Sequence, residues 1–109
     1  MFEKNLALVP LLDWYGALLS ERQRTLLDLY YNQDLSLAEI AAEVGISRQG
    51  VREGIKKAEE EISFFEQHLH LAARAEALLL AGKRIEVDAE SEETRTAVRA
   101  LLEAAGLTQ

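Results

Sequence analysis

The chain has 109 residues and a net charge of −7, about half of its residues are apolar, and it contains no cysteine. This length fits one domain, or one domain with an appendage, and the apolar fraction is too high for a disordered chain. The lack of cysteine excludes disulfides, thiolate nucleophiles and Cys-based zinc or iron–sulfur sites. No apolar run is long enough to cross a bilayer and the N-terminus does not read as a signal peptide, so we expect a soluble, cytoplasmic protein that does not contact membranes.

Apolar residues recur three and four positions apart over most of the chain, which predicts an all-α fold of about five to six helices. A first helix is expected at roughly 9–19, because Pro10 suits the first turn of a helix and not its interior. Ser20 and Gln23 match a capping box, in which each side chain bonds the backbone of the other residue. This box predicts the start of a second helix, which ends near Asn32.

The segment 37–52 meets the requirements of a helix-turn-helix. Ser36 begins a short helix as part of a second capping box, and Ala41 is a small residue where the two helices must touch. Gly45, four residues on, supplies the left-handed turn, and Ser47 can cap the following helix. The expected apolar anchors of the corner are Ile40, Val44, Ile46 and Val51. The alternative is that this helix-turn-helix serves only for packing or for docking another protein.

The second helix of the motif carries a basic patch within an otherwise acidic protein. If it enters a major groove, its outward side chains are candidates for base contacts, because Arg and Gln match the edges of guanine and adenine. These candidates are Arg48, Gln49, Arg52 and Lys56. Ser47, Lys57 and the helix N-terminus are candidate phosphate contacts, and the alternative is that the cations are only solvated surface charges. Gly50 and Gly54 either admit a ligand close to the backbone or simply weaken the helix.

The second helix of the motif, which is the fourth helix of the chain, is expected to be long, because six of its apolar residues follow a heptad spacing. They are Val51, Ile55, Ala58, Ile62, Phe65 and Leu69. The helix either continues past this seam or breaks near His70. The outer residues Ile62, Phe65 and Leu69 either pack within the monomer or meet a second copy in a two-fold dimer. We favour the dimer, because the helix would otherwise expose them beyond a small core.

Gly82 is expected to end this region, which gives a helix-turn-helix domain at 1–81 and a linker with a last helix at 82–109. Ser91 is a cap for that amphipathic helix, and Gly106 is its stop. No catalytic constellation is evident, and no metal or cofactor is expected. His68 and His70 lie two residues apart, so they would point to opposite sides of a helix. We therefore expect a protein that binds rather than an enzyme.

Several blocks of the sequence resemble the YlxM-like family of small bacterial DNA-binding proteins, whose helix-turn-helix is similar to sigma-factor region 4. The blocks lie at 13–23, 29–41, 45–51 and 55–57, and the resemblance covers roughly residues 10 to 70 but not the tail. It implies an all-α, cytoplasmic, dimeric protein. It also implies a gene linked to those of the signal recognition particle, and hence a regulatory role in that pathway.

Two functions are therefore predicted. In the first, the protein is a nucleic-acid-binding regulator, and a homodimer places two recognition helices on DNA. In the alternative, it is an adaptor that docks on the protein or RNA of the signal recognition particle without sequence-specific DNA binding. The net charge of −7 counts against nucleic-acid binding as a bulk property and motivates the alternative.

Overall fold

The computed structural model describes residues 3–107, which form six α-helices and three short helical turns, with no strand in that range. The helices belong to two compact units, one that ends at Leu69 and one that begins at His70. The predicted all-α class and the long fourth helix are confirmed. Within the described range, no helix is both long and apolar enough to span a membrane.

The N-terminal helix of the first unit is shorter than the sequence predicted. A 3-10 turn, η1 (Leu6–Leu8), leads into α1 (Val9–Tyr15), and Pro10 lies in its first turn as expected. The helix then tightens into a second 3-10 turn, η2 (Gly16–Leu18), so the expected helix at 9–19 is divided into two elements.

Both predicted capping boxes are present. Ser20 Oγ accepts from the amide of Gln23 at 3.1 Å and begins α2 (Glu21–Leu27), which runs into a π-helical turn, η3 (Asp28–Asn32). Ser36 Oγ accepts from the amide of Glu39 at 3.1 Å and begins α3 (Leu37–Val44). In each box the side chain at the third helical position bonds back to the serine amide, which satisfies a backbone donor at the helix start.

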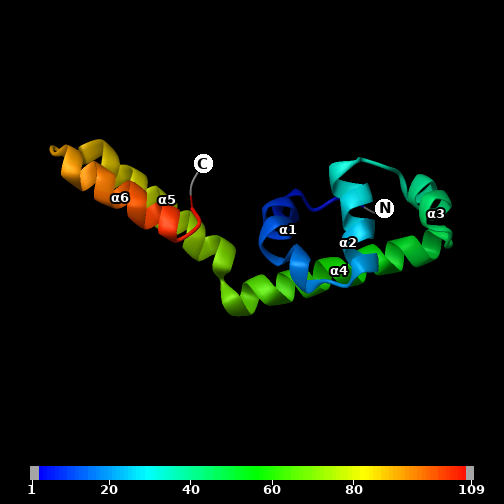
Figure 1. The fold of residues 1–109 in the computed structure, drawn as a ribbon. Coiled ribbons are helices and arrows are strands. Elements are labelled where there is room, and N and C mark those ends of the chain that lie inside the picture. Colours follow the sequence, from blue (N-terminus) through cyan, green and yellow to red (C-terminus); the bar gives the residue numbers. More distant parts are fainter. Residues whose placement is uncertain (1–2, 108–109) are drawn as a thin grey trace. The chain divides into compact units, whose positions relative to one another are not determined.

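Helix α4 (Arg48–Leu69) is the element against which α1, α2 and α3 pack, as Figure 1 shows. Its inward residues are four fully buried members of the heptad seam: Val51, Ile55, Ala58 and Ile62. They join Tyr15, Leu26 and Ile40 of the other helices in one hydrophobic core. Burying this apolar surface from α1 to α4 is the main force that holds the unit together.

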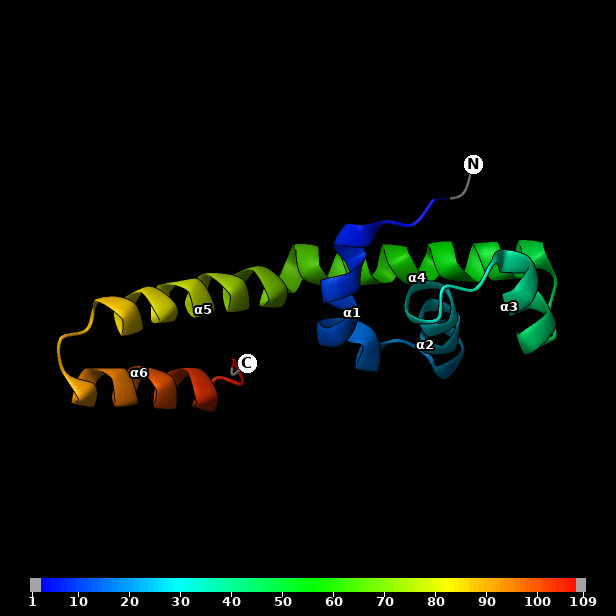
Figure 2. The ribbon, with the colours of Figure 1, turned by 90° about the horizontal axis from the view of Figure 1, so that it is seen from above.

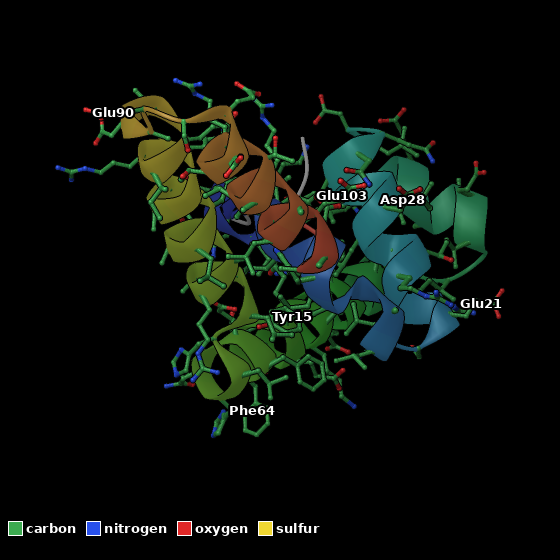
Figure 3. All side chains as sticks on the ribbon, turned by 60° about the vertical axis from the view of Figure 1, so that its left-hand side comes forward. Tyr15, Glu21, Asp28, Phe64, Glu90 and Glu103 are labelled. Carbon is green, nitrogen blue, oxygen red and sulfur yellow. The ribbon has the colours of Figure 1, made fainter. Side chains whose placement is uncertain are left out.

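Two tyrosines fasten the N-terminal elements to α4 by hydrogen bonds to carboxylates. Tyr15 Oη, whose position Figure 3 labels, donates to Glu66 Oε1 at 2.5 Å, and Tyr31 Oη donates to Glu59. The backbone amide of Asn5 donates to Tyr31 Oη at 3.1 Å. These bonds link residues that are 26 to 51 positions apart in the chain.

The expected dimer interface is wrong for Ile62, the first of its three residues. Ile62 is completely buried in the core of the first unit, and the ring of Phe65 packs at its edge with its centroid 5.9 Å from that of Tyr15. Of the three predicted interface residues, Leu69 is the most exposed, at 44%. The buried part of the seam is therefore covered within the first unit, which is the intramolecular alternative.

The long helix ends at His70 and does not continue. His70 has φ of 56°, in the left-handed region, and separates α4 from α5 (Leu71–Asp88). The boundary expected between 81 and 82 therefore lies inside a helix, and the division between compact units lies at 69 and 70. Gly82 does not end a helix, because it is buried where α5 packs against Leu102.

The second unit is a hairpin of α5 and α6 (Glu92–Ala104), which run side by side in opposite directions in Figures 1 and 2. Ser91 caps α6 by accepting from the amide of Thr94 at 3.1 Å, and Gly106, with φ of 76°, follows its end, as predicted. The hairpin core consists of Val98, Leu102 and Leu107, with Ala75 and Leu79 packed against them.

Candidate nucleic-acid interface

The predicted corner between two helices is present at Gly45. Gly45 ends α3 with φ of 81°, a conformation that glycine adopts without steric cost. The carbonyl of Ala41 accepts from the amides of Gly45 at 2.9 Å and of Ile46 at 3.2 Å, which closes the last turn of α3. Ala41 and Val51, one from each helix, are both buried in the same core. Helices α3 and α4 therefore form a helix-turn-helix whose small contact residue is Ala41.

Ser47 fixes the start of α4 as predicted. Its Oγ accepts from the amide of Gly50 at 3.0 Å, and its carbonyl accepts from the amide of Val51 at 3.0 Å. A capped N-terminus of a helix is a favourable place for an anion, because the first backbone amides point outward and the helix dipole is positive there. Arg48 and Gln49, which occupy the first positions after this cap, are exposed.

All six predicted contact residues are exposed, but they do not form one cluster. Arg48, Arg52 and Lys56 follow one another at intervals of four, so they form a single stripe along the first turns of α4. Lys57 lies about 140° around the helix from Arg52, since each residue turns an α-helix by about 100°. The stripe of Arg48, Arg52 and Lys56, which we call the basic stripe, is therefore the charged feature of this surface, and Lys57 faces elsewhere.

The start of α3 borders the basic stripe, which sequence reasoning did not predict. Three residues from α3 and its cap line one hollow with three from α4: Ser36, Leu37 and Ala38, and Arg48, Gln49 and Arg52. The signal was present in the sequence, because the capping box at Ser36 marks a helix N-terminus and therefore a set of outward amides. The corner at Gly45 brings this N-terminus beside that of α4.

Acidic side chains flank the same surface. Gln49 Nε2 donates to Glu53 Oε1 at 3.1 Å, so a base contact by Gln49 would require this bond to exchange. Glu39 Oε1 accepts from the amide of Ser36 at 3.0 Å. The hydrogen bonds from Ser36 hold the pKa of the Glu39 carboxyl below its ordinary value, which keeps it charged at neutral pH. Nucleic acid would thus meet a narrow cationic stripe with the Glu53 carboxylate close beside it.

The two glycines of α4 lie close to side chains of the protein itself. A Cβ atom at Gly50 would lie 3.2 Å from Ser47 Oγ and 3.5 Å from Ile46 Cδ1, and one at Gly54 would collide with Leu26. Both positions therefore face the inside of the unit. The sequence offered close approach of a ligand or a weakened helix as explanations of these glycines. In the structure, side chains of the protein itself approach their backbone closely.

The described residues, 3–107, contain no group of three His, Asp or Glu side chains that could hold a metal ion. His68 Nδ1 lies 2.9 Å from the carbonyl oxygen of Phe64, and the two rings are 4.1 Å apart between centroids. Figure 3 shows Phe64 on the outer side of α4. Phe64 and His68 lie near the C-terminal end of α4, away from the basic stripe.

Residues 2–100 match a family described as "Putative helix-turn-helix protein, YlxM / p13 like", under the name UPF0122. The chain belongs to this family. The match includes most of the hairpin, so the UPF0122 resemblance extends well beyond the region at 10 to 70 that the sequence blocks indicated.

Relatives with the same family name occur in several bacteria. A UPF0122 protein of Clostridium kluyveri is 52% identical over 69 residues, which cover 63% of this chain and 62% of that protein. One of Thermoanaerobacter pseudethanolicus is 42% identical over 79 residues, which cover 72% and 68%. One of Caldanaerobacter subterraneus is 41% identical over 86 residues, which cover 79% and 71%. The chain thus spans about two thirds of the length of these UPF0122 relatives.

Proposed function

We propose that this UPF0122 protein is a cytoplasmic, nucleic-acid-binding regulatory protein that acts by binding and not by catalysis. The observation that carries the proposal is the basic stripe, which is exposed on the first turns of α4 beside the N-terminus of α3. In a helix-turn-helix the second helix enters the major groove while the first crosses the phosphate backbone. The arrangement of α3 and α4 supports both contacts at once.

Each part of this surface has a role that follows from its chemistry. Arg48 and Arg52 can reach base edges or phosphates, because a guanidinium offers several donors in a fixed plane. Lys56, one turn further along, is suited to a phosphate. The net charge of −7 gives little long-range attraction, so affinity depends on these short-range contacts and is modest without the correct target.

We also propose that the protein binds DNA as a homodimer. A two-fold pair of helix-turn-helix units reads two half-sites about one helical turn of DNA apart, roughly 34 Å. Two weak DNA-binding surfaces in one dimer bind DNA far more tightly than either surface alone, because the second contact becomes intramolecular. This would compensate for the narrow basic stripe.

The test is a titration of the full chain into a labelled duplex of random sequence at several salt concentrations, read by fluorescence anisotropy. The logarithm of the binding constant should fall linearly with the logarithm of salt concentration. The double variant Arg48→Ala with Arg52→Ala should abolish the signal. The matched control, Arg22→Ala with Arg24→Ala, removes two exposed cations of α2 and should leave binding nearly intact. Equal binding by the two double variants would refute the proposal.

A second function is an adaptor on the signal recognition particle, which the net charge of −7 favours over a general DNA binder. The adaptor function is supported because the negatively charged surface away from the basic stripe can contact a basic protein, while the stripe contacts RNA. The experiment adds the purified particle RNA and the purified particle protein, separately, to the same titration. Binding to either one with no binding to duplex DNA selects the adaptor, and binding to the duplex alone rejects it.

A further inference from the structure

The hairpin of α5 and α6 has a very small core of its own. Among its described residues, 70–107, three side chains form this core, Val98, Leu102 and Leu107, and two further apolar residues, Ala75 and Leu79, pack against them. A unit of about forty residues with so few buried side chains does not repay the entropy of ordering its chain. The hairpin therefore needs a further apolar contact, and its surface shows where that contact lies.

The two edges of the hairpin differ in chemistry. One edge is charged, because Arg99 Nε donates to Glu86 Oε1 at 2.9 Å, and Lys83 and Glu103 line the hollow beside them. Lys83 follows the buried Gly82 by one position, and Arg99 follows the buried Val98 by one. Each is therefore turned about 100° from the face where the helices touch, toward this shared edge.

The opposite edge is apolar. Leu78 precedes the inward Leu79 by one position, and Leu101 precedes the buried Leu102 by one, so both turn away from the charged edge. Ile85 lies seven residues after Leu78 and shares its face. These three side chains are 57%, 68% and 50% exposed for Leu78, Leu101 and Ile85. We call this edge, together with Ala81 between Leu78 and Ile85, the apolar edge.

A positive and a negative side chain lie at the two ends of the apolar edge, at equal distances along the sequence from Ala81. Arg74 and Asp88 are each seven residues from Ala81, one before it and one after it, and both are exposed. Seven residues are two helical turns, so Arg74, Ala81 and Asp88 lie in one row. A hollow lined in part by Ala81, Ile85 and Asp88 lies along the same row and offers space for an inserted side chain.

We propose that the apolar edge is the contact between two copies of this chain, with α5 of one copy antiparallel to α5 of the other. A two-fold axis at Ala81 places Arg74 of each copy opposite Asp88 of the second copy. Leu78 of each copy then lies near Ile85 of the other, and the small Ala81 lets the helices approach closely. The charge pattern selects this antiparallel register, because a parallel pairing in register would set Arg74 against Arg74.

This inference rests on the homodimer in the proposed function and replaces Ile62, Phe65 and Leu69 as its interface. Asp88 already has a long ion pair of 4.0 Å with Arg84 on its own helix. That pair is highly exposed on both sides, so it is weak and can yield to Arg74 of the second copy. Leu80 and Val87 are also exposed on α5, but they lie on the back of the helix, away from the apolar edge.

The decisive experiment uses charge reversal in the full chain, with mass measured by sedimentation equilibrium. Arg74→Glu alone and Asp88→Lys alone each place like charges opposite one another at both ends of the contact. Each variant should raise the dimer dissociation constant by on the order of tenfold or more. An equimolar mixture of the two variants should recover the dimer, because every reversed charge then meets its opposite. A mixture that stays monomeric would overturn the proposal, as would a wild-type chain that is monomeric at the same concentrations.

A second pair of variants tests the apolar contact. Leu78→Gln with Ile85→Gln should dissociate the dimer, while the matched control Leu80→Gln with Val87→Gln, at 61% and 80% exposed, should not. Circular dichroism checks that both keep their helix content. A dimer that resists the first pair would contradict the inference. DNA binding is measured separately, so a dimer that forms as described but ignores DNA counts against the proposed function and not against this interface.

Discussion

The Cβ atom that any side chain would add at Gly54 lies 2.6 Å from Cδ1 of Leu26, so close that one of the two atoms would have to shift. Leu26 is almost completely buried, at 1% exposed, in the core shared by α2 and α4. Glycine at this position therefore sets how closely α4 lies against α2. Helix α4 carries the basic stripe on its exposed side, so this distance also sets where the stripe lies relative to α2.

Gly54→Ala should destabilise the protein, although alanine stabilises an exposed helix by about 1 kcal/mol relative to glycine. The added methyl group forces Leu26 off its position in a packed core, and such overpacking costs about 1–3 kcal/mol. The measurement is the free energy of unfolding in urea. Glu53→Ala, at the neighbouring exposed position, is the control and should change it little. A more stable Gly54→Ala variant would mean that α2 moves freely against α4.

Gly45→Ala should lower the free energy of unfolding by about 1–2 kcal/mol, because φ of 81° places its Cβ against the backbone. Contacts with more distant residues are not the cause, since none beyond the chain neighbours of Gly45 lies within 4 Å of that Cβ position. Gly45→Asn should cost less, because asparagine tolerates the left-handed region better than alanine does. Thermal unfolding of the three proteins provides the order. Equal losses for alanine and asparagine would point to a cause other than backbone conformation.

Tyr31→Phe should lower stability at neutral pH by about 1.5–3 kcal/mol, because the hydroxyl donates to the Glu59 carboxylate. It should also change the response to alkali. Burial and the bond to Glu59 raise the pKa of Tyr31 far above its ordinary value near 10. The folded state thus keeps a proton that the unfolded state loses, so this stabilisation is complete below pH 10 and falls as pH rises further.

Urea unfolding of wild type and Tyr31→Phe between pH 8 and about 11 tests this account. The variant should show a shallower loss of stability above pH 10. It should retain some slope, because burial also raises the pKa of Tyr30. Parallel curves for the two proteins would show that Tyr31 does not keep its proton in the folded state.

Lys56→Ala and Lys57→Ala should differ in their effect on nucleic-acid binding, although the residues are neighbours. Lys56 belongs to the basic stripe, while Lys57 lies about 140° around α4 from Arg52. The Lys56 variant should reduce the slope of log binding constant against log salt by about one, as expected for one lost phosphate contact. The Lys57 variant should keep the wild-type slope. The reverse order would show that α4 enters the groove by another face.

Local signals in the sequence were enough for the helix-turn-helix. Capping boxes at Ser20 and Ser36, the turn at Gly45 and the cap at Ser47 each depend on bonds between residues a few positions apart. Such bonds are written directly into the order of residue types, so a single sequence predicts them. The exposure of Arg48 and Arg52 followed from the same periodicity that buries Val51 and Ile55.

The break at His70 was one of two alternatives that the sequence left open. A non-glycine residue in the left-handed region costs about 1–2 kcal/mol locally, so neither composition nor spacing marks the position strongly. Gly82 was wrongly predicted to end a helix. A glycine in a sequence indicates a helix end, but it also occurs within a helix where a neighbouring side chain occupies the space of a Cβ atom. Leu102 is that neighbour, and it lies 20 positions away in the chain.

The sequence by itself determined which residues begin and end helices, and which face of each helix is apolar, because both depend on neighbours within a turn or two. Only the tertiary structure decided what covers each apolar face: Tyr15 of α1 packs against Phe65, Leu26 fills the space at Gly54, and Leu102 fills that at Gly82. The physical reason is that apolar attraction is non-directional. Periodicity shows that a surface must be buried, but close packing between distant segments selects its partner.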